Sequence, residues 1–198
     1  MSPLVESLKL KEGVIQNLGY HQNRLNRSMA ELFPVADAID LSRSISIPEQ
    51  CKVGIFKIRV VYDSVIEVIE IEPYQFRSIE SLKVVHHPDI DYHLKYTDRQ
   101  ILNELFAQRG DCDDIIIVKN GLVTDSFAAN LLFFDGQRWV TSSTPLLKGT
   151  KRQLLLDQGI IVEAKIRMED ILTYHKVGLI NAMIDFDEML VVAMDQVF

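Results

Sequence analysis

The feature that most restricts the fold of this chain is the pair Asn120-Gly121, which stands between the apolar run Ile115–Val118 and a return segment that begins at Val123. Asn and Gly adopt a positive φ at low cost, so this pair between apolar runs is the strongest local signal for a β-hairpin. Further turns are predicted at Lys11-Glu12-Gly13, Asp63-Ser64 and Asp135-Gly136. The strands predicted around these turns are Leu4–Leu10, Val14–Leu18, Lys52–Tyr62, Val65–Glu72 and Asn130–Phe134. A chain with so many hairpins is expected to build antiparallel sheets.

Helical periodicity appears between the hairpins. The spacing of Leu25, Met29 and Leu32 predicts a helix over Tyr20–Phe33, which a proline ends. The polar, proline-containing segment His86–Asp89 is typical of a connection between units. The remaining predicted elements are helices at Asp98–Arg109, Thr150–Gln158 and Met168–Tyr174 and strands at Ile160–Ile166, Val177–Asn181 and Met189–Met194. We therefore expect an α+β protein with two units, residues 1–87 and 88–198.

The charge balance restricts the partners. The 198 residues carry a net charge of −7, and no basic stripe is present to neutralise phosphates, so nucleic acid is not an expected partner. A few local arginines can still hold a small anion. The sequence shows no signal-peptide pattern and no apolar run of membrane-spanning length, so we expect a cytoplasmic protein without a membrane partner. Cys51 and Cys112 lie in no metal-like spacing and are expected to be reduced thiols.

Four separated segments carry residues suited to cofactor chemistry. The first is His21–Leu25, which includes an arginine, and the second is Lys95 with Arg99 four residues later, a spacing that shares one face of a helix. The third is Val123–Phe133, where an acid, small residues and an asparagine interrupt apolar strands. The fourth is Thr144–Arg152, where a glycine precedes a helix whose first N–H groups can hold a phosphate. Each segment alone also has an ordinary structural interpretation as a surface cation, a loop or a turn.

Together and in this order, the four segments resemble the class IV aminotransferase family, also called fold type IV pyridoxal 5'-phosphate (PLP) enzymes, from Leu4 to Asn181. Members of that family include branched-chain aminotransferases, D-amino-acid aminotransferase and 4-amino-4-deoxychorismate lyase. The resemblance implies a D-amino-acid aminotransferase-like fold of two α+β domains with PLP between them. It also implies a small anionic substrate with an amino group, and a homodimer.

The resemblance assigns roles to individual residues. Lys95 corresponds to the lysine that forms the Schiff base with PLP and moves protons, and Asp125 to the acid that pairs with the pyridine nitrogen. Arg24 corresponds to the arginine that binds the cofactor phosphate. Arg59 and Arg99 are expected to bind substrate carboxylates. The other cofactor-binding positions implied by the match are Asn130, Leu147, Gly149, Thr150, Asn181 and Ala182.

The chain departs from the family pattern in three places. Asp125 stands where the family has a longer glutamate, and Gly149–Arg152 reads Gly-Thr-Lys-Arg where aminotransferases have Gly-Ile-Thr-Arg. The usual N-terminal strand is missing, so part of the pocket wall is absent or comes from another subunit. These departures keep a non-catalytic homologue among the alternatives.

The reaction is left open between a lyase and an aminotransferase. The pair Lys95 and Arg99, the Asn-Ala-Met stretch at 181–183 and the absence of Gly-Ile-Thr-Arg resemble the lyases. The favoured interpretation is a shortened 4-amino-4-deoxychorismate lyase, which releases pyruvate and p-aminobenzoate for folate synthesis. The alternative is a branched-chain or D-amino-acid aminotransferase.

Overall fold

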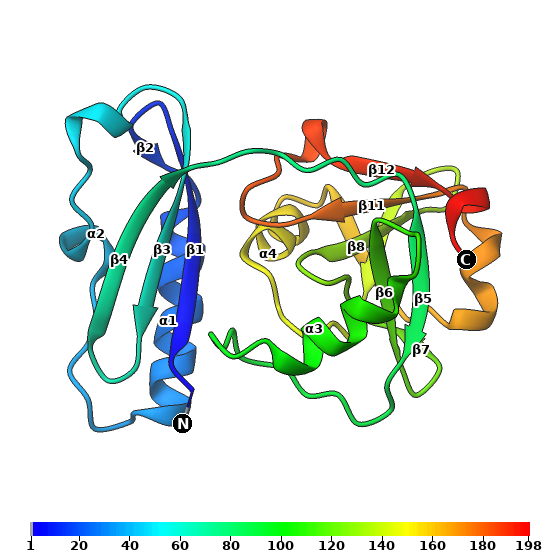
Figure 1. Cartoon of the computed structure of the whole chain (residues 1–198), viewed down its shortest axis with the longest axis horizontal. Helices are drawn as coiled ribbons and strands as arrows, with labels where there is room; N and C mark the ends of the chain where they lie inside the picture. Colours follow the sequence, from blue (N-terminus) through cyan, green and yellow to red (C-terminus); the bar gives the residue numbers. More distant parts are fainter. Residues whose placement is uncertain (1) are drawn as a thin grey trace. The chain divides into compact units, whose positions relative to one another are not determined.

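A computed structural model describes residues 2–198, and the chain divides into two compact units (Figure 1). Unit 1 contains the chain up to Phe76 together with Leu94–Asp98, and unit 2 contains Arg77–His93 and Arg99–Phe198. The expected division at residues 87 and 88 is therefore displaced. The strand β5 (Leu82–His86) pairs with a strand of unit 2, whereas the short segment Leu94–Asp98 returns to unit 1.

Unit 1 is built on a four-stranded antiparallel sheet with the strand order β2-β1-β3-β4. Its strands are β1 (Leu4–Lys11), β2 (Val14–Ile15), β3 (Ile55–Tyr62) and β4 (Ile66–Pro73). Its helices are α1 (Leu18–Leu32), α2 (Leu41–Ser44) and a 3-10 turn at Glu49–Cys51. The predicted hairpins and the predicted first helix are present, but β2 is short because α1 begins already at Leu18.

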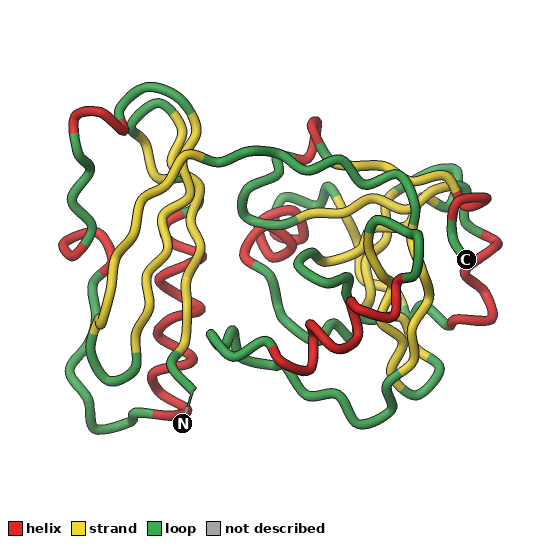
Figure 2. The backbone as a smooth tube through the Cα atoms, in the orientation of Figure 1, coloured by secondary structure: helices red, strands yellow, loops and turns green. Residues whose placement is uncertain are grey.

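One face of this sheet packs against α1, which runs along the strands in Figure 2. Alternate residues of β1 point to the same face, and Leu4, Leu8 and Leu10 are fully buried there against Leu25 and Met29 of the helix. Burial of an apolar side chain of this size stabilises a fold by roughly 1.5–3 kcal/mol. This core fixes the helix that carries Arg24 onto the strand that carries Glu6.

The segment that contains Lys95 is extended and lies beside β1. The Val5 N–H donates to Lys95 O at 2.9 Å, and Leu4 and Tyr96 form an antiparallel bridge. Arg99 instead precedes the helix α3 in unit 2. Lys95 and Arg99 would share one face only in a helix, and the backbone at Lys95 is instead hydrogen-bonded to a neighbouring strand.

Unit 2 contains two sheets, one with the order β10-β9-β8-β11-β12 and one with the order β5-β6-β7. The strands not yet given are β6 (Asp114–Lys119), β7 (Leu122–Val123), β8 (Asn130–Phe134), β9 (Trp139–Ser142), β10 (Ile161–Ala164), β11 (Lys176–Ile180) and β12 (Leu190–Ala193). The helices are α3 (Gln100–Phe106) and α4 (Thr150–Asp157), with 3-10 turns at Ala107–Arg109, Met168–Thr173, Phe186–Glu188 and Met194–Gln196. The α+β fold class is confirmed by this architecture.

The predicted turn at Asn120-Gly121 joins β6 to β7, and both residues have a positive φ, 50° and 78°. The strand β7 ends after two residues, because the chain then leaves the three-stranded sheet as the loop 124–129 and enters the five-stranded sheet as β8. The core beneath this loop includes Leu131, Phe133 and Val177. The segment expected as a helix at Met168–Tyr174 is a 3-10 turn. The core strands thus hold in place the loop that carries Asp125.

Within residues 2–198, no helix is both long enough and apolar enough to cross a membrane.

Candidate functional site

A buried ion cluster lies in unit 1 where β1 meets α1. Glu6 accepts two hydrogen bonds from Arg24, with Nε to Oε1 at 2.8 Å and Nη2 to Oε2 at 2.6 Å. The His21 ring donates its Nδ1–H to the same Oε2 at 2.6 Å. All three residues are at most 7% exposed. Such two-point pairing between an arginine and a carboxylate fixes the orientation of the guanidinium.

The cluster sets the charges of its members. Burial by itself would raise the pKa of Glu6, but the charge and hydrogen bonds of Arg24 and the contact with His21 lower it to about 2. Burial lowers the pKa of His21, and the charges of Arg24 and Lys95 lower it further, against the opposing effect of Glu6. His21 is therefore held neutral between a carboxylate and two cations. The effect of Lys95 on His21 shows that the lysine lies within electrostatic reach of this cluster.

Glu6 is a site residue to which sequence analysis assigns no role. It stands on the apolar face of β1, between Leu4 and Leu8, and an acid in an apolar strand face signals a buried partner. The sequence predicts Arg24 as a binding residue. It does not show that Arg24 pairs with Glu6, because the two residues are 18 positions apart.

Arg59 lies on the other face of the same sheet. It pairs with Ser7 in the register of β1 and β3, and its Nη1 donates to Glu70 on β4 at 2.8 Å. Lys9 and Lys57 are direct cross-strand partners two positions further along this face. Like charges directly opposite each other destabilise a sheet, but Lys57 Nζ pairs with Glu72 on β4 at 2.6 Å, so acids of the next strand offset the charges of this basic cluster (Lys9, Lys57 and Arg59).

The second group of predicted residues lies in unit 2 around Asp125. Asn130 Nδ2 donates to Asp125 Oδ1 at 2.7 Å and to Leu147 O at 2.9 Å. The Leu147 N–H donates to Asp125 Oδ2 at 2.8 Å. These bonds connect the loop before β8, the first residue of β8 and the loop before α4. The network thus connects Asp125 and Asn130 to Leu147, which follows 17 positions after Asn130.

Asp125 titrates unusually because it is only 6% exposed. Burial raises the pKa of its carboxyl to about 6, although the hydrogen bonds from Leu147 and Asn130 and the charge of Arg152 act in the opposite direction. A carboxyl in this range can bind or release a proton near neutral pH.

Gly149 precedes α4 and touches Asn130. A Cβ atom at position 149 would fall on Asn130 Oδ1, so only glycine permits this approach. Gly149 supplies no side chain to cap the first turn of α4. The N-terminus of this helix therefore keeps backbone N–H donors and a partial positive charge for an anion.

The first turn of α4 carries two buried cations. Lys151 Nζ pairs with Asp185 at 3.0 Å, and Arg152 Nη2 donates to Ser142 O at 2.8 Å and pairs with Glu163. Among residues 2–198, the buried Nε of Arg152 has no hydrogen-bond partner. Lys151 takes the place of the threonine in the family pattern, so an ammonium stands where a hydroxyl was expected.

Asn181 and Ala182 follow directly after β11. Asn181 Nδ2 donates to Ala128 O at 3.3 Å, and its Oδ1 accepts from the Met183 N–H at 2.9 Å. This contact places Asn181 beside the loop 124–129 in unit 2.

Arg99 is held by aromatic residues. Its guanidinium lies over the ring of Phe127 at 4.4 Å, and its Nη2 donates to Phe127 O at 2.7 Å. The Phe127 ring also stacks on Phe106 at 4.3 Å, and the Phe127 N–H donates to Asp114 at 3.2 Å. Phe127 is two residues after Asp125, so these contacts give Arg99 a role in holding the Asp125 loop, beside the substrate role expected from the sequence.

Residues 2–198 contain no group of three or more histidine, cysteine or acidic side chains that could hold a metal ion. Cys51 and Cys112 are free thiols.

The comparison with known proteins agrees with this arrangement. Residues 3–186 match the amino-transferase class IV family, and the chain belongs to that family. An uncharacterized protein of Haemophilus influenzae is 40% identical over 185 residues, which cover 92% of this chain and 98% of that protein. The enzymes of the family depend on PLP.

Two solved structures show the same fold. One is a candidate 4-amino-4-deoxychorismate lyase from Haemophilus somnus, with a TM-score of 0.88 and 35% identity over 92% of this chain and 97% of that one. The other is the PLP-bound form of a hypothetical aminotransferase from Mycobacterium tuberculosis, with a TM-score of 0.77 and 17% identity over 96% of this chain and 80% of that one. The fold type predicted from the sequence is confirmed.

Proposed function

We propose that this protein binds PLP and is a 4-amino-4-deoxychorismate lyase. The observation that carries the proposal is the buried Asp125–Asn130–Leu147 network beside the uncapped start of α4, in a chain that belongs to a PLP-dependent family. The residues present fit the cofactor. A carboxyl that titrates near neutrality suits the pyridine nitrogen, and the glycine-led helix start suits the phosphate.

When bound, PLP supplies an electron sink for charge that develops on the substrate carbon next to the amino group. Asp125 would hold a proton at the pyridine nitrogen, and the first-turn N–H groups of α4, with Arg24, would anchor the phosphate. Leu147 would give the ring an apolar surface, and Asn130 and Asn181 would fix the loops around it.

Lys95 would act as the base and acid of the reaction. In the lyase reaction a proton leaves the ring carbon that bears the amino group, and the bond from the ring to the enolpyruvyl oxygen breaks. The ring becomes aromatic as p-aminobenzoate, and the enolpyruvate takes up a proton to become pyruvate. A lysine amine that accepts the first proton can return one to the leaving group, provided that it is neutral when it acts.

Two observations favour the lyase over an aminotransferase. The Haemophilus somnus protein described as a candidate for this activity is 35% identical over nearly the full length of both chains. The substrate of the lyase carries two carboxylates, and the cluster of Lys9, Lys57 and Arg59 offers cations on one sheet face. Glu70 and Glu72 pair with Arg59 and Lys57, so the incoming carboxylates would replace carboxylates already in place. We also propose that the protein is a homodimer in solution, which light scattering would test.

Cofactor binding is tested separately from the reaction. Purified protein mixed with PLP is expected to show a cofactor absorption band, and borohydride reduction should attach the cofactor to the peptide that contains Lys95. The exposed Lys165→Ala variant should behave as the wild type, and Lys95→Ala should lose the attachment. A reduced cofactor attached to a different lysine would refute the role of Lys95. Absence of any spectral change at micromolar PLP would favour a non-catalytic homologue.

The reaction is tested by its products. The PLP-loaded protein with 4-amino-4-deoxychorismate should release pyruvate and p-aminobenzoate in equal amounts, measured by a coupled dehydrogenase and by fluorescence. Formation of oxo acids from branched-chain or D-amino acids, without p-aminobenzoate release, would show an aminotransferase instead.

A further inference from the structure

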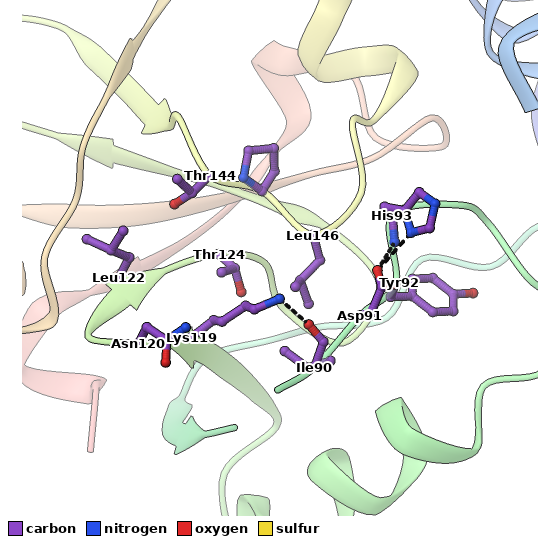
Figure 3. Close-up of a pocket in the computed structure, with 11 residues that line it drawn as sticks. Ile90, Asp91, Tyr92, His93, Lys119, Asn120, Leu122, Thr124, Thr144 and Leu146 are labelled. Atoms are coloured by element: carbon purple, nitrogen blue, oxygen red, sulfur yellow. Dashed lines mark hydrogen bonds and ion pairs between the residues drawn. The ribbon is translucent and has the colours of Figure 1, made fainter. Parts of the chain in front are cut away.

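A cavity that is distinct from the Asp125 network lies wholly within unit 2 and has a volume of about 350 Å³ (Figure 3). Three loops form its walls: residues 90–93, the turn after β6, and residues 144–146. This volume is within the range of small-molecule sites. None of the residues to which the PLP proposal gives a role lines this cavity.

The cavity contains one cation, Lys119. In Figure 3 its side chain extends across the cavity, and its Nζ donates to Ile90 O at 2.6 Å. An ammonium has three donors, and in the part of the chain that the structure describes Ile90 O is the one acceptor that Lys119 reaches. The amide of Asn120 and the hydroxyl of Thr144 lie on the same walls. The wall of the cavity therefore includes a partly buried positive charge and two further side chains that can donate hydrogen bonds.

The rest of the wall is largely apolar, with Ile90, Leu122, Pro145 and Leu146 among its residues. The one carboxylate on the wall is that of Asp91, which accepts from the His93 N–H and ring at 3.2 and 2.8 Å. The pKa of Asp91 is lowered by these hydrogen bonds and by the charge of Lys119, so Asp91 and a bound anion would share that cation.

The cavity and the Asp125 network lie on opposite sides of two chain segments. Thr124 lines the cavity and its hydroxyl donates to Ile117 O, whereas the next residue, Asp125, points into the network. Leu146 lines the cavity, whereas the N–H of the next residue, Leu147, donates to Asp125. A ligand in the cavity would therefore bind behind the network that we assign to the cofactor.

We propose that this cavity binds a small carboxylate with an apolar body. The carboxylate would bind Lys119 Nζ with help from Asn120 and Thr144, and the body would pack on Ile90, Leu122 and Leu146. Lys119 also holds the carbonyl of Ile90, and the chain continues from there to Lys95 within five residues. An occupied cavity would thus act on the segment that leads to Lys95.

Benzoate is the first probe, and benzamide, which has the same shape without the charge, is its control. Calorimetric titration of the full chain should show benzoate binding and at least tenfold weaker binding of benzamide. Lys119→Met should weaken benzoate at least tenfold, and Lys119→Arg should retain most of the affinity. The exposed Lys165→Met should bind as the wild type, and equal melting temperatures would show that the variants are folded.

Two further variants separate this site from the substrate site. Leu122→Trp fills the cavity and should abolish benzoate binding, whereas Lys95→Ala should leave it unchanged, whether or not the protein is a PLP enzyme. Benzoate binding that survives both Lys119→Met and Leu122→Trp would overturn the proposal. So would binding that disappears with Lys95→Ala, or no binding at millimolar benzoate.

Discussion

Asn130 Oδ1 occupies the space that a Cβ atom would need at position 149. The asparagine can come so close because residue 149 is glycine, and from this position its amide bonds both Asp125 and Leu147. The contact therefore joins the acid loop to the start of α4. A side chain larger than that of glycine at position 149 should therefore disturb both the acid loop and the start of α4.

Gly149→Ala is expected to force Asn130 out of its place, at a cost on the order of 1–3 kcal/mol in the free energy of unfolding. PLP affinity should fall with it, because the helix start and the acid loop separate. Gly19→Ala in α1 is the matched control, since its Cβ would meet open space and alanine favours a helix. Urea unfolding and a PLP titration check both effects. If Gly149→Ala equalled the wild type in both, the contact would have no role.

Arg99→Met should destabilise the protein by about 1–3 kcal/mol, through the lost contact with the Phe127 ring and the lost hydrogen bond to its carbonyl. Arg99→Lys should not restore stability, because an ammonium lacks the planar group that stacks on the ring. Exposed Arg138, which pairs with Asp135, serves as the control in Arg138→Met. An unchanged melting temperature together with a raised KM for Arg99→Met would instead assign Arg99 to the substrate.

Glu6→Gln should cost about 3–5 kcal/mol, because the buried Arg24 would lose its counter-charge. The pair of Lys57 and Glu72, whose side chains are 30% and 57% exposed, provides the control, and Glu72→Gln should change stability by about 1 kcal/mol or less. Chemical unfolding at pH 7 measures both variants. If the two substitutions changed the free energy of unfolding equally, burial would not make the Glu6–Arg24 pair more important for stability than the Lys57–Glu72 pair.

Glu6 also makes the protein sensitive to acid. Its pKa is lowered from 4.5 to about 2 in the folded state, so its stabilising effect is complete above pH 4.5. That effect, roughly 3 kcal/mol, should disappear as the pH falls from 4.5 towards 2. Unfolding measured across this range should show the loss in the wild type and a much weaker dependence in Glu6→Gln.

The pKa shift of Asp125 has the opposite sign to that of Glu6. Its folded pKa is raised from 3.8 to about 6, so the folded protein without PLP binds the proton more tightly than the unfolded chain does. Stability should therefore fall by up to about 3 kcal/mol as the pH rises from 4 to 6. Asp125→Asn, which has no proton to lose, should flatten this region of the curve. A wild-type stability that rises with pH between 4 and 6 would contradict the assignment.

Local signals predicted much of the fold. Asn120-Gly121 is recognisable because its two positive φ angles favour these residues, and the spacing of Leu25 and Met29 marks α1. The strand β5 was not separated from unit 1, because its partner β6 is parallel and begins 28 residues after the end of β5, counted from His86 to Asp114. Pairings of that kind leave no local trace in the sequence.

In the candidate site, too, contacts between distant segments could not be predicted from local sequence patterns. Asp125, Asn130 and Leu147 were identified from their order along the chain, and the structure connects them by hydrogen bonds. Lys95 and Arg99 do not share a helical face, because the segment at Lys95 lies beside a distant strand, which spacing alone cannot show. The ion pair of Glu6 with Arg24 depends on tertiary packing between β1 and α1, which the spacing of residues along the chain does not show.

The return of Leu94–Asp98 to β1 has a consequence for synthesis of the protein. Domains tend to fold as they leave the ribosome, N-terminal part first. Here the bonds of Val5 and Thr97 that complete unit 1 need residues up to Asp98. Unit 1 can therefore be completed only after the ribosome has made β5, the first strand of unit 2, and then Leu94–Asp98. A stalled product that ends at Phe76 would lack this segment and, with it, Lys95.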